Sequence, residues 1–124
     1  MSIDQIAAID REHSTPFVPT WAPEDVGPEG FREVERRCFA SADGALFGGL
    51  WEGEPGTLRV QPYPYDEICV ILSGRVALVD EQGGRREFGA GDAFFVPRSF
   101  SGTWETLEPS EKIFVGYDPR GEGA

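Results

Sequence analysis

The chain has 124 residues and a mass of 13.6 kDa, which suits one domain with a single hydrophobic core. Its net charge of −11 at pH 7 disfavours contact with phosphates, so we expect neither nucleic acid nor an anionic membrane surface as a partner. The sequence has no apolar run of membrane-spanning length and no basic N-terminal region before an apolar stretch, so neither a spanning helix nor a signal peptide is predicted. Two cysteines are too few for a disulfide scaffold, which favours a cytoplasmic location.

Residues 1–30 differ in composition from the rest of the chain. The isoleucines within residues 3–9 allow one or two helical turns, but the four prolines between positions 16 and 28 exclude a regular helix and favour extended or turn conformations. We therefore expect a mostly irregular, proline-rich N-terminal arm rather than a separate domain. Three apolar side chains are expected to anchor this arm on the body or on a partner subunit: Phe17, Val18 and Trp21.

Residues 31–120 are divided into short apolar segments by glycine and proline turns. Such segments at a spacing of about 8–12 residues are typical of an all-β sandwich or barrel. The sequence therefore predicts one all-β domain over residues 31–120. The expected strands lie within residues 31–40, 45–53, 57–65, 66–74, 75–84, 85–91, 92–100, 101–109 and 111–119.

Two motifs in this region resemble those of the cupins. In the first, Gly74 follows Glu67 after six residues and begins the strand GRVALVD; in the second, GDAFFVP, five residues separate Gly91 from Pro97. These are the non-histidine landmarks of the two cupin motifs, and the resemblance covers about residues 45–117. The chain is similar to small single-domain, RmlC-like cupins of the subfamily that includes the cupin part of ureidoglycine aminohydrolase and ethanolamine-utilisation cupins. The resemblance implies a jelly-roll-type double-stranded β-helix barrel and a homodimer.

The histidines that hold the metal in most cupins are missing from this chain. The resemblance places the motif glutamate at Glu67 and the third histidine at Gly102. It places the two preceding histidines at Gln61 and Tyr63, or at Val60 and Pro62 under a looser spacing. None of these is histidine, and the single histidine, His13, lies in the arm. A three-histidine site within one subunit is therefore excluded, and we predict no metal and no cofactor.

A weaker metal site without histidine is the alternative. Alternate side chains of a strand share a face, so Glu67 and Cys69 should point the same way. Tyr63 and Gln61 could add oxygen ligands. The competing interpretation is that Cys69 is a small buried apolar residue.

Glu67 is the leading candidate for a catalytic role because it interrupts an otherwise apolar strand. It is predicted to act as a general base or to hold a substrate, or else only to pair with a nearby donor. Lys112 begins the last expected strand and is the candidate partner that offsets the charge of Glu67 in place of a metal. This pairing requires the two charged groups to lie within about 6 Å of each other. The alternative is a lysine that extends along the surface into solvent.

Aromatic residues are the candidate ligand-binding groups. Tyr63, Tyr65 and Trp104 could stack on a sugar or a planar ligand, with Tyr63 also a candidate acid–base partner of Glu67; packing in the core is the alternative. Trp51 is expected at a sheet or subunit interface. The other ligand-binding candidates are Cys69, Gln61 and Arg98, the last as a site for an anionic group.

Three functions fit these observations. The first is a cupin that binds a small polar metabolite, possessing no three-histidine metal site and serving as an accessory protein in carbohydrate or nitrogen metabolism. The second is a metal-independent isomerase or hydrolase that uses Glu67 with Lys112 or Tyr63. The third is a structural dimer whose barrel is filled by side chains. An open cavity lined by Tyr63, Glu67 and Trp104 favours the first two.

Overall fold

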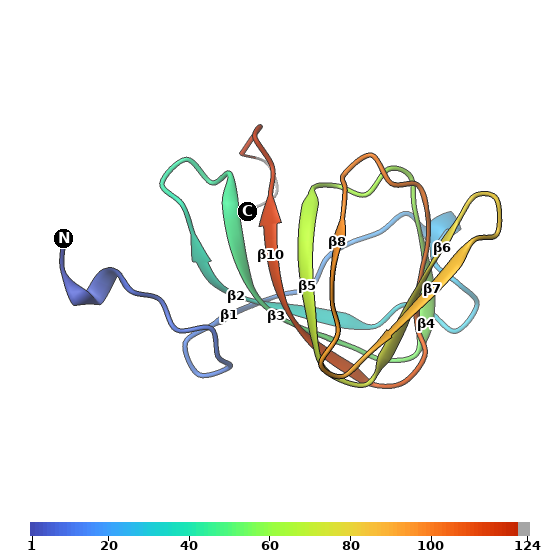
Figure 1. Cartoon of the computed structure of the whole chain (residues 1–124), viewed down its shortest axis with the longest axis horizontal. Helices are drawn as coiled ribbons and strands as arrows, with labels where there is room; N and C mark the ends of the chain where they lie inside the picture. The colour runs from blue at the N-terminus through green and yellow to red at the C-terminus, as the bar shows by residue number, and fades with distance from the viewer. Residues whose placement is uncertain (122–124) are drawn as a thin grey trace.

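The computed structural model describes residues 1–121, and its regular secondary structure consists almost entirely of antiparallel strands (Figure 1). Its elements are η1 (Ile3–Gln5), β1 (Thr15–Phe17), η2 (Pro23–Asp25), β2 (Glu33–Ala40), β3 (Leu46–Gly53), β4 (Gly56–Val60), β5 (Asp66–Ser73), β6 (Arg75–Asp80), β7 (Arg85–Gly89), β8 (Ala93–Val96), β9 (Gly102–Thr106) and β10 (Ser110–Tyr117). A six-stranded sheet has the order β1-β2-β3-β10-β5-β8, and a four-stranded sheet has the order β4-β9-β6-β7. Each of the nine segments expected between residues 31 and 120 contains a strand, and the all-β jelly-roll prediction is confirmed.

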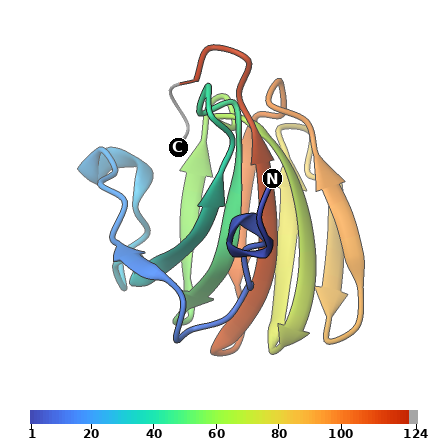
Figure 2. The same cartoon turned by 90° about the vertical axis from the view of Figure 1, so that its left-hand side faces the viewer.

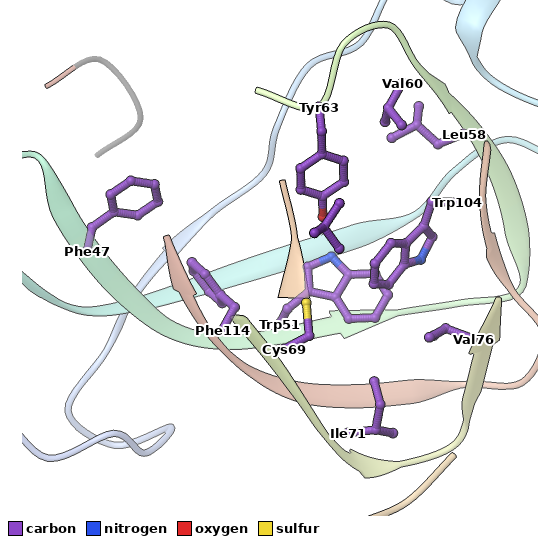
Figure 3. Close-up of a cluster of buried hydrophobic side chains, with 11 residues drawn as sticks. Phe47, Trp51, Leu58, Val60, Tyr63, Cys69, Ile71, Val76, Trp104 and Phe114 are labelled. Atoms are coloured by element: carbon purple, nitrogen blue, oxygen red, sulfur yellow. The ribbon is translucent and has the colours of Figure 1, made fainter. Parts of the chain in front are cut away.

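The two sheets enclose a core that is built by the alternation of side chains along each strand. In β5, Cys69 and Ile71 are buried between the sheets, while the intervening residues point outward. In β10, Lys112 and Phe114 point inward, and the antiparallel register places Phe114 opposite Cys69. The buried cluster, drawn in Figure 3, is Phe47, Trp51, Leu58, Val60, Tyr63, Cys69, Ile71, Val76, Val96, Trp104 and Phe114.

The motif glycine Gly74 makes the tight connection between β5 and β6. Its φ of +85° lies in the left-handed region, where a residue with a Cβ is strained. A Cβ at this position would also lie 2.2 Å from Ser110 Oγ and 2.4 Å from the carbonyl oxygen of Pro109. Both the backbone conformation and the close approach of β10 therefore require glycine here.

The N-terminal arm is more regular than the sequence suggested. Residues 15–17 form β1, which pairs with β2 at the edge of the six-stranded sheet. Further along, Val26 forms an isolated bridge with Leu58 of β4, so the arm connects the edges of the two sheets. Among the three predicted anchors, Trp21 packs against the core. Phe17 and Val18 are 44% and 66% exposed, so they do not anchor the arm on the body of this chain, and their contact with a partner subunit stays a prediction.

Residues 1–9 extend away from the barrel in Figure 1, and in Figure 2, turned by 90°, they lie in front of it. The single turn η1 contains no buried residue. Within residues 1–121, no helix is long and apolar enough to cross a bilayer.

Candidate functional site

The carboxylate of Glu67 is the centre of a buried hydrogen-bonded cluster inside the barrel. Its Oε1 accepts hydrogen bonds from Tyr63 Oη at 2.5 Å, from Cys69 Sγ at 3.0 Å and from Lys112 Nζ at 3.2 Å. Lys112 Nζ also donates to Cys69 Sγ at 3.5 Å. The 3.2 Å separation satisfies the distance condition for the predicted Glu67–Lys112 pair. Strands β5 and β10 supply three of the four residues, and the loop before β5 supplies Tyr63.

The ammonium group of Lys112 lies between two indole rings. Nζ is 4.1 Å from the ring centroid of Trp104 and 4.8 Å from that of Trp51, close enough for cation–π attraction. Burial disfavours the charged lysine, but Cys69 and Glu67 outweigh burial, so the pKa of Lys112 lies above its ordinary value. The ammonium of Lys112 is therefore a positive charge beside Glu67 and Cys69, the two side chains considered above as ligands of a metal ion.

The other two donors of the cluster keep their protons. Burial, and then the neighbouring charge of Glu67, raise the pKa of the Tyr63 hydroxyl well above its ordinary value. The same two causes raise the pKa of the Cys69 thiol well above its ordinary value. At neutral pH both groups are thus neutral hydrogen-bond donors rather than nucleophiles.

A second carboxylate, Glu33, faces the same space from β2. It accepts hydrogen bonds from the indole N–H of Trp21 at 2.5 Å and of Trp51 at 2.7 Å. Burial raises the pKa of Glu33 despite these two hydrogen bonds, which lower it. Sequence reasoning missed this residue. The available signal was the alternation of Glu33 and Glu35 in one expected strand, which places two carboxylates on the same inward face.

Tyr63, Glu67, Lys112 and Glu33 border a cavity of about 40 Å³, which has room for roughly two or three water molecules. Figure 3 shows Tyr63 pointing into the barrel toward Trp51 and Cys69, with Trp104 beside Trp51. The cavity is lined by Trp21, Phe31, Glu33, Glu35, Trp51, Leu58, Val60, Tyr63, Pro64, Tyr65, Glu67, Trp104, Lys112 and Phe114.

One oxygen of the central carboxylate is left for a ligand. All three hydrogen bonds to Glu67 use Oε1, and none within residues 1–121 uses Oε2. No buried side-chain oxygen or nitrogen in the described chain lacks a hydrogen-bond partner. Oε2 is therefore not sealed in the core, and it can accept a hydrogen bond from a molecule in the cavity.

Two sequence expectations differ from this arrangement. Gln61 is exposed and is not part of the cavity lining, because it precedes the loop that turns the chain inward at Tyr63. Arg98 is exposed too and lies at a separate outer hollow beyond Tyr63. Trp51 is only 4% exposed and lines the cavity, and its ring lies 5.6 Å from that of Trp104 in the other sheet, which agrees with the expected position at a sheet interface. Of the remaining candidates, Tyr65 and Trp104 line the cavity.

The residues present do not suit a divalent metal. Residues 1–121 contain no group of three or more histidine, cysteine, aspartate or glutamate side chains arranged to hold one. The two candidate ligands, Glu67 and Cys69, already contact the ammonium of Lys112, which would repel a second cation. The weaker metal site considered from the sequence is therefore unsupported.

Solved structures support the fold. The chain aligns with the EutQ protein of Clostridium difficile at 22% identity, covering 59% of this chain and 56% of that one, with a TM-score of 0.54. It aligns with the ethanolamine utilization protein Q of Salmonella typhimurium at 18% identity over 84% and 94% of the two chains, with a TM-score of 0.62. A protein of unknown function from Pseudomonas syringae pv. tomato gives a TM-score of 0.72 at 22% identity, over 83% of this chain and 43% of that one.

The chain spans little more than half the length of the Clostridium protein, and at these identities the likeness shows the fold alone. No match is found among curated proteins. The family model of the EutQ-like cupin domain matches residues 40–114, which include both motifs and the Glu67–Lys112 pair. This match extends over more than half of the chain, which therefore belongs to the EutQ-like cupin family.

Proposed function

We propose that this protein binds a small polar molecule in the barrel cavity without a metal ion. The observation that carries this proposal concerns the two oxygens of Glu67, a residue that lines the cavity. Oε1 accepts hydrogen bonds from three internal donors, whereas Oε2 accepts none from residues 1–121. A carboxylate held by a buried lysine and a tyrosine is a rigid acceptor, and rigid polar groups in an apolar cavity orient a ligand.

Charge favours a ligand that carries hydrogen-bond donors or a positive charge. The cavity wall contains three carboxylates, Glu33, Glu35 and Glu67, but only one cationic group, Lys112. Glu67 is paired with Lys112, and Glu35 forms an ion pair with Arg37 at 3.0 Å. Glu33 forms no ion pair within residues 1–121, so an anion in this cavity would face an unbalanced negative charge. Small amines and polyols meet these conditions, and small carboxylates do not.

The cavity size limits the ligand to a few non-hydrogen atoms unless the arm moves. Trp21 closes one side of the cavity, and its indole is held by one hydrogen bond to Glu33. The proline-rich segment that carries Trp21 is attached to β4 through the Val26–Leu58 bridge. Displacement of this segment is the simplest way for a larger molecule to enter.

The proposal is tested by titration calorimetry with methylamine, glycerol and acetate as probes, each at up to about 10 mM. We expect methylamine or glycerol to bind at least tenfold more tightly than acetate, which corresponds to about 1.4 kcal/mol. Glu67→Gln should weaken that binding at least tenfold. Glu108→Gln, on an exposed turn, is the matched control and should bind as the wild type does. Tighter binding of acetate, or no heat with any probe, would contradict the proposal.

Acid–base catalysis at the same site is the second candidate. It is favoured by the contact of a protonated phenol, Tyr63, with a carboxylate, Glu67, at the edge of the cavity. Proton exchange of a bound carbon acid, followed by NMR in D₂O, separates this function from binding alone. Binding without exchange in the wild type would leave the protein as a binding module, which could serve carbohydrate or nitrogen metabolism.

A further inference from the structure

A second hollow lies where the two sheets end at their edge strands β7 and β8. Its lining residues fall within residues 78–88 of the β6–β7 hairpin and residues 93–100 of β8 and the loop after it, and it is here called the edge hollow. In Figure 1 the hairpin lies on the side of the barrel opposite to the N-terminal end. The edge hollow has a volume of about 430 Å³, which is within the usual range of small-molecule sites. It shares no residue with the lining of the cavity around Glu67.

The floor of the edge hollow is aromatic. Phe88 of β7 and Phe94 of β8 stack with their ring centroids 4.0 Å apart and an angle of 16° between the ring planes. These two rings, together with Phe100 and Leu78, pack against the buried core, yet each of the four side chains stays partly exposed. A ring of a bound molecule would therefore cover apolar surface that the chain itself leaves in contact with water.

The positive charge of Arg86 lies beside this floor. The register pairs Arg86 with Leu78 and Leu78 with Trp104, whose side chain is buried between the sheets. Residues directly opposite each other in an antiparallel pair share a face, so Arg86 is on the inner face of β7. Its guanidinium carbon is 5.3 Å from the ring centroid of Phe88, which is also on this face.

Arg86 forms no ion pair within residues 1–121, although acidic residues outnumber basic ones by 22 to 11 in this chain. The neighbouring arginines behave differently. Arg75 and Arg85 both pair with Glu87, and Arg85 also pairs with Glu105. The arginine that faces the aromatic floor is thus left without a carboxylate in the part of the chain that the structure describes.

The lining of the edge hollow has a net positive charge. Its charged residues are Arg85, Arg86 and Asp80. Asp80 Oδ1 accepts hydrogen bonds from two backbone N–H groups of the β6–β7 turn, which compensate part of its charge. The cavity around Glu67 has the opposite balance, with three carboxylates and one lysine. The edge hollow therefore favours an anion, which that cavity disfavours.

We propose that the edge hollow binds a small aromatic carboxylate, with its ring on the aromatic floor and its carboxylate on the guanidinium of Arg86. A guanidinium presents N–H donors in a planar fork that matches the two oxygens of a carboxylate. The floor supplies apolar contact and Arg86 supplies charge, so a ligand needs both a ring and an acid group. This proposal goes beyond the function proposed for the barrel cavity and does not depend on it, because the two sites share no residue.

The test is a titration of the full ¹⁵N-labelled chain, followed by ¹H–¹⁵N NMR, with benzoate, benzyl alcohol, benzylamine and acetate at up to about 10 mM each. We expect benzoate to shift the amide signals of residues 84–88 and 93–97 with a dissociation constant of about 1 mM or below. Benzyl alcohol lacks the charge, acetate lacks the ring and benzylamine has the opposite charge. Each of these three should bind to the edge hollow at least about tenfold more weakly than benzoate.

Arg86→Gln should weaken the binding of benzoate at least about tenfold and leave the weaker binding of benzyl alcohol unchanged. Arg32→Gln is the matched control, since Arg32 is also exposed and without an ion pair in residues 1–121 but lies at a different hollow. This control should bind benzoate as the wild type does.

Three outcomes would overturn the proposal. The first is the absence of saturable shifts with benzoate up to about 10 mM, or binding of benzoate no tighter than that of benzylamine. The second is equal affinity of the wild type and Arg86→Gln for benzoate. The third is a set of benzoate shifts centred on residues 63–69, which would place the molecule in the cavity around Glu67 instead.

Discussion

Lys112 Nζ lies 3.2 Å from Glu67 Oε1 inside the barrel, and both side chains are only 4% exposed. An ion pair at this depth is stable only if further hydrogen bonds compensate the lost hydration. Tyr63 and Cys69 supply these to the carboxylate, and two indole rings flank the ammonium. The buried ion pair is thus compensated by side chains of this chain, and Lys112 supplies the positive charge beside the Glu67 carboxylate.

Removing one partner of this pair should be strongly destabilising. Lys112→Met leaves the Glu67 carboxylate buried without a counter-charge, which costs about 3–5 kcal/mol. The double variant Lys112→Met/Glu67→Gln removes both charges and should recover at least half of that loss. Urea denaturation of the wild type, Lys112→Met, Glu67→Gln and the double variant measures the four free energies of unfolding.

The two single variants and the double variant form a thermodynamic cycle. A loss below about 1 kcal/mol for Lys112→Met would show that water reaches the carboxylate and that the pair is not buried in solution. A double variant less stable than Lys112→Met would show that the two side chains act independently.

Some residues of the candidate site could be predicted from the sequence, but how deeply the site is buried could not. The cupin resemblance and the balance of charge suggested that Lys112 pairs with Glu67, with a lysine extended along the surface as the alternative, and the structure brings the two groups together. Glu33 was missed because a glutamate in a strand of mixed charge is ordinarily solvent-facing. Its burial depends on Trp21, which reaches it from the arm through a contact that no local pattern encodes.

The same limit explains the errors at the surface. Gln61 was placed at the site by analogy with a metal ligand, yet the chain turns inward only at Tyr63. Phe17 was expected to anchor the arm on the body or on a partner subunit, and within the single chain it lies exposed on the edge strand β1. Periodicity predicts which faces are shared, but which long-range segment covers a face is decided by tertiary packing.

Stability should fall as the pH rises above about 9, the ordinary pKa of a cysteine thiol. The unfolded chain releases the Cys69 proton there, while the folded chain retains it, so the unfolded state binds fewer protons and is favoured. Tyr63 and Lys112, whose pKa values are also raised in the folded state, extend the loss to higher pH. Each such group contributes up to about 1.4 kcal/mol per pH unit.

Thermal unfolding between pH 8 and pH 11 measures this loss. Cys69→Ala should make the decline between pH 9 and pH 10 shallower. Cys38→Ala, at a partly buried thiol that contacts the arm, is the matched substitution. If the unfolding temperature of the wild type does not change between pH 8 and pH 11, the prediction is contradicted, and the hydrogen-bonded cluster around Glu67 is open to water.

Cys69 should be inert toward thiol reagents in the folded protein. Its side chain is fully buried, and its thiol retains its proton, so neither access nor thiolate is available. Cys38 is only partly buried and is the expected site of modification. Labelling with a disulfide reagent should therefore stop at one thiol per chain, and Cys38→Ala should show none until denaturant is added. Two rapidly reacting thiols would contradict the buried position of Cys69.

Gly74 and Gly83 provide a paired test of the motif glycine. Both have a left-handed backbone, with φ of +85° and +86°, so alanine at either position carries the same strain of about 1–2 kcal/mol. A Cβ at Gly83 meets nothing within 4 Å, whereas one at Gly74 lies 2.2 Å from Ser110 Oγ. Gly74→Ala should therefore lower the free energy of unfolding by about 1–3 kcal/mol more than Gly83→Ala does. The added methyl group either overpacks against Ser110 or forces β10 to shift. Equal losses in urea denaturation would mean that backbone conformation alone requires glycine at position 74.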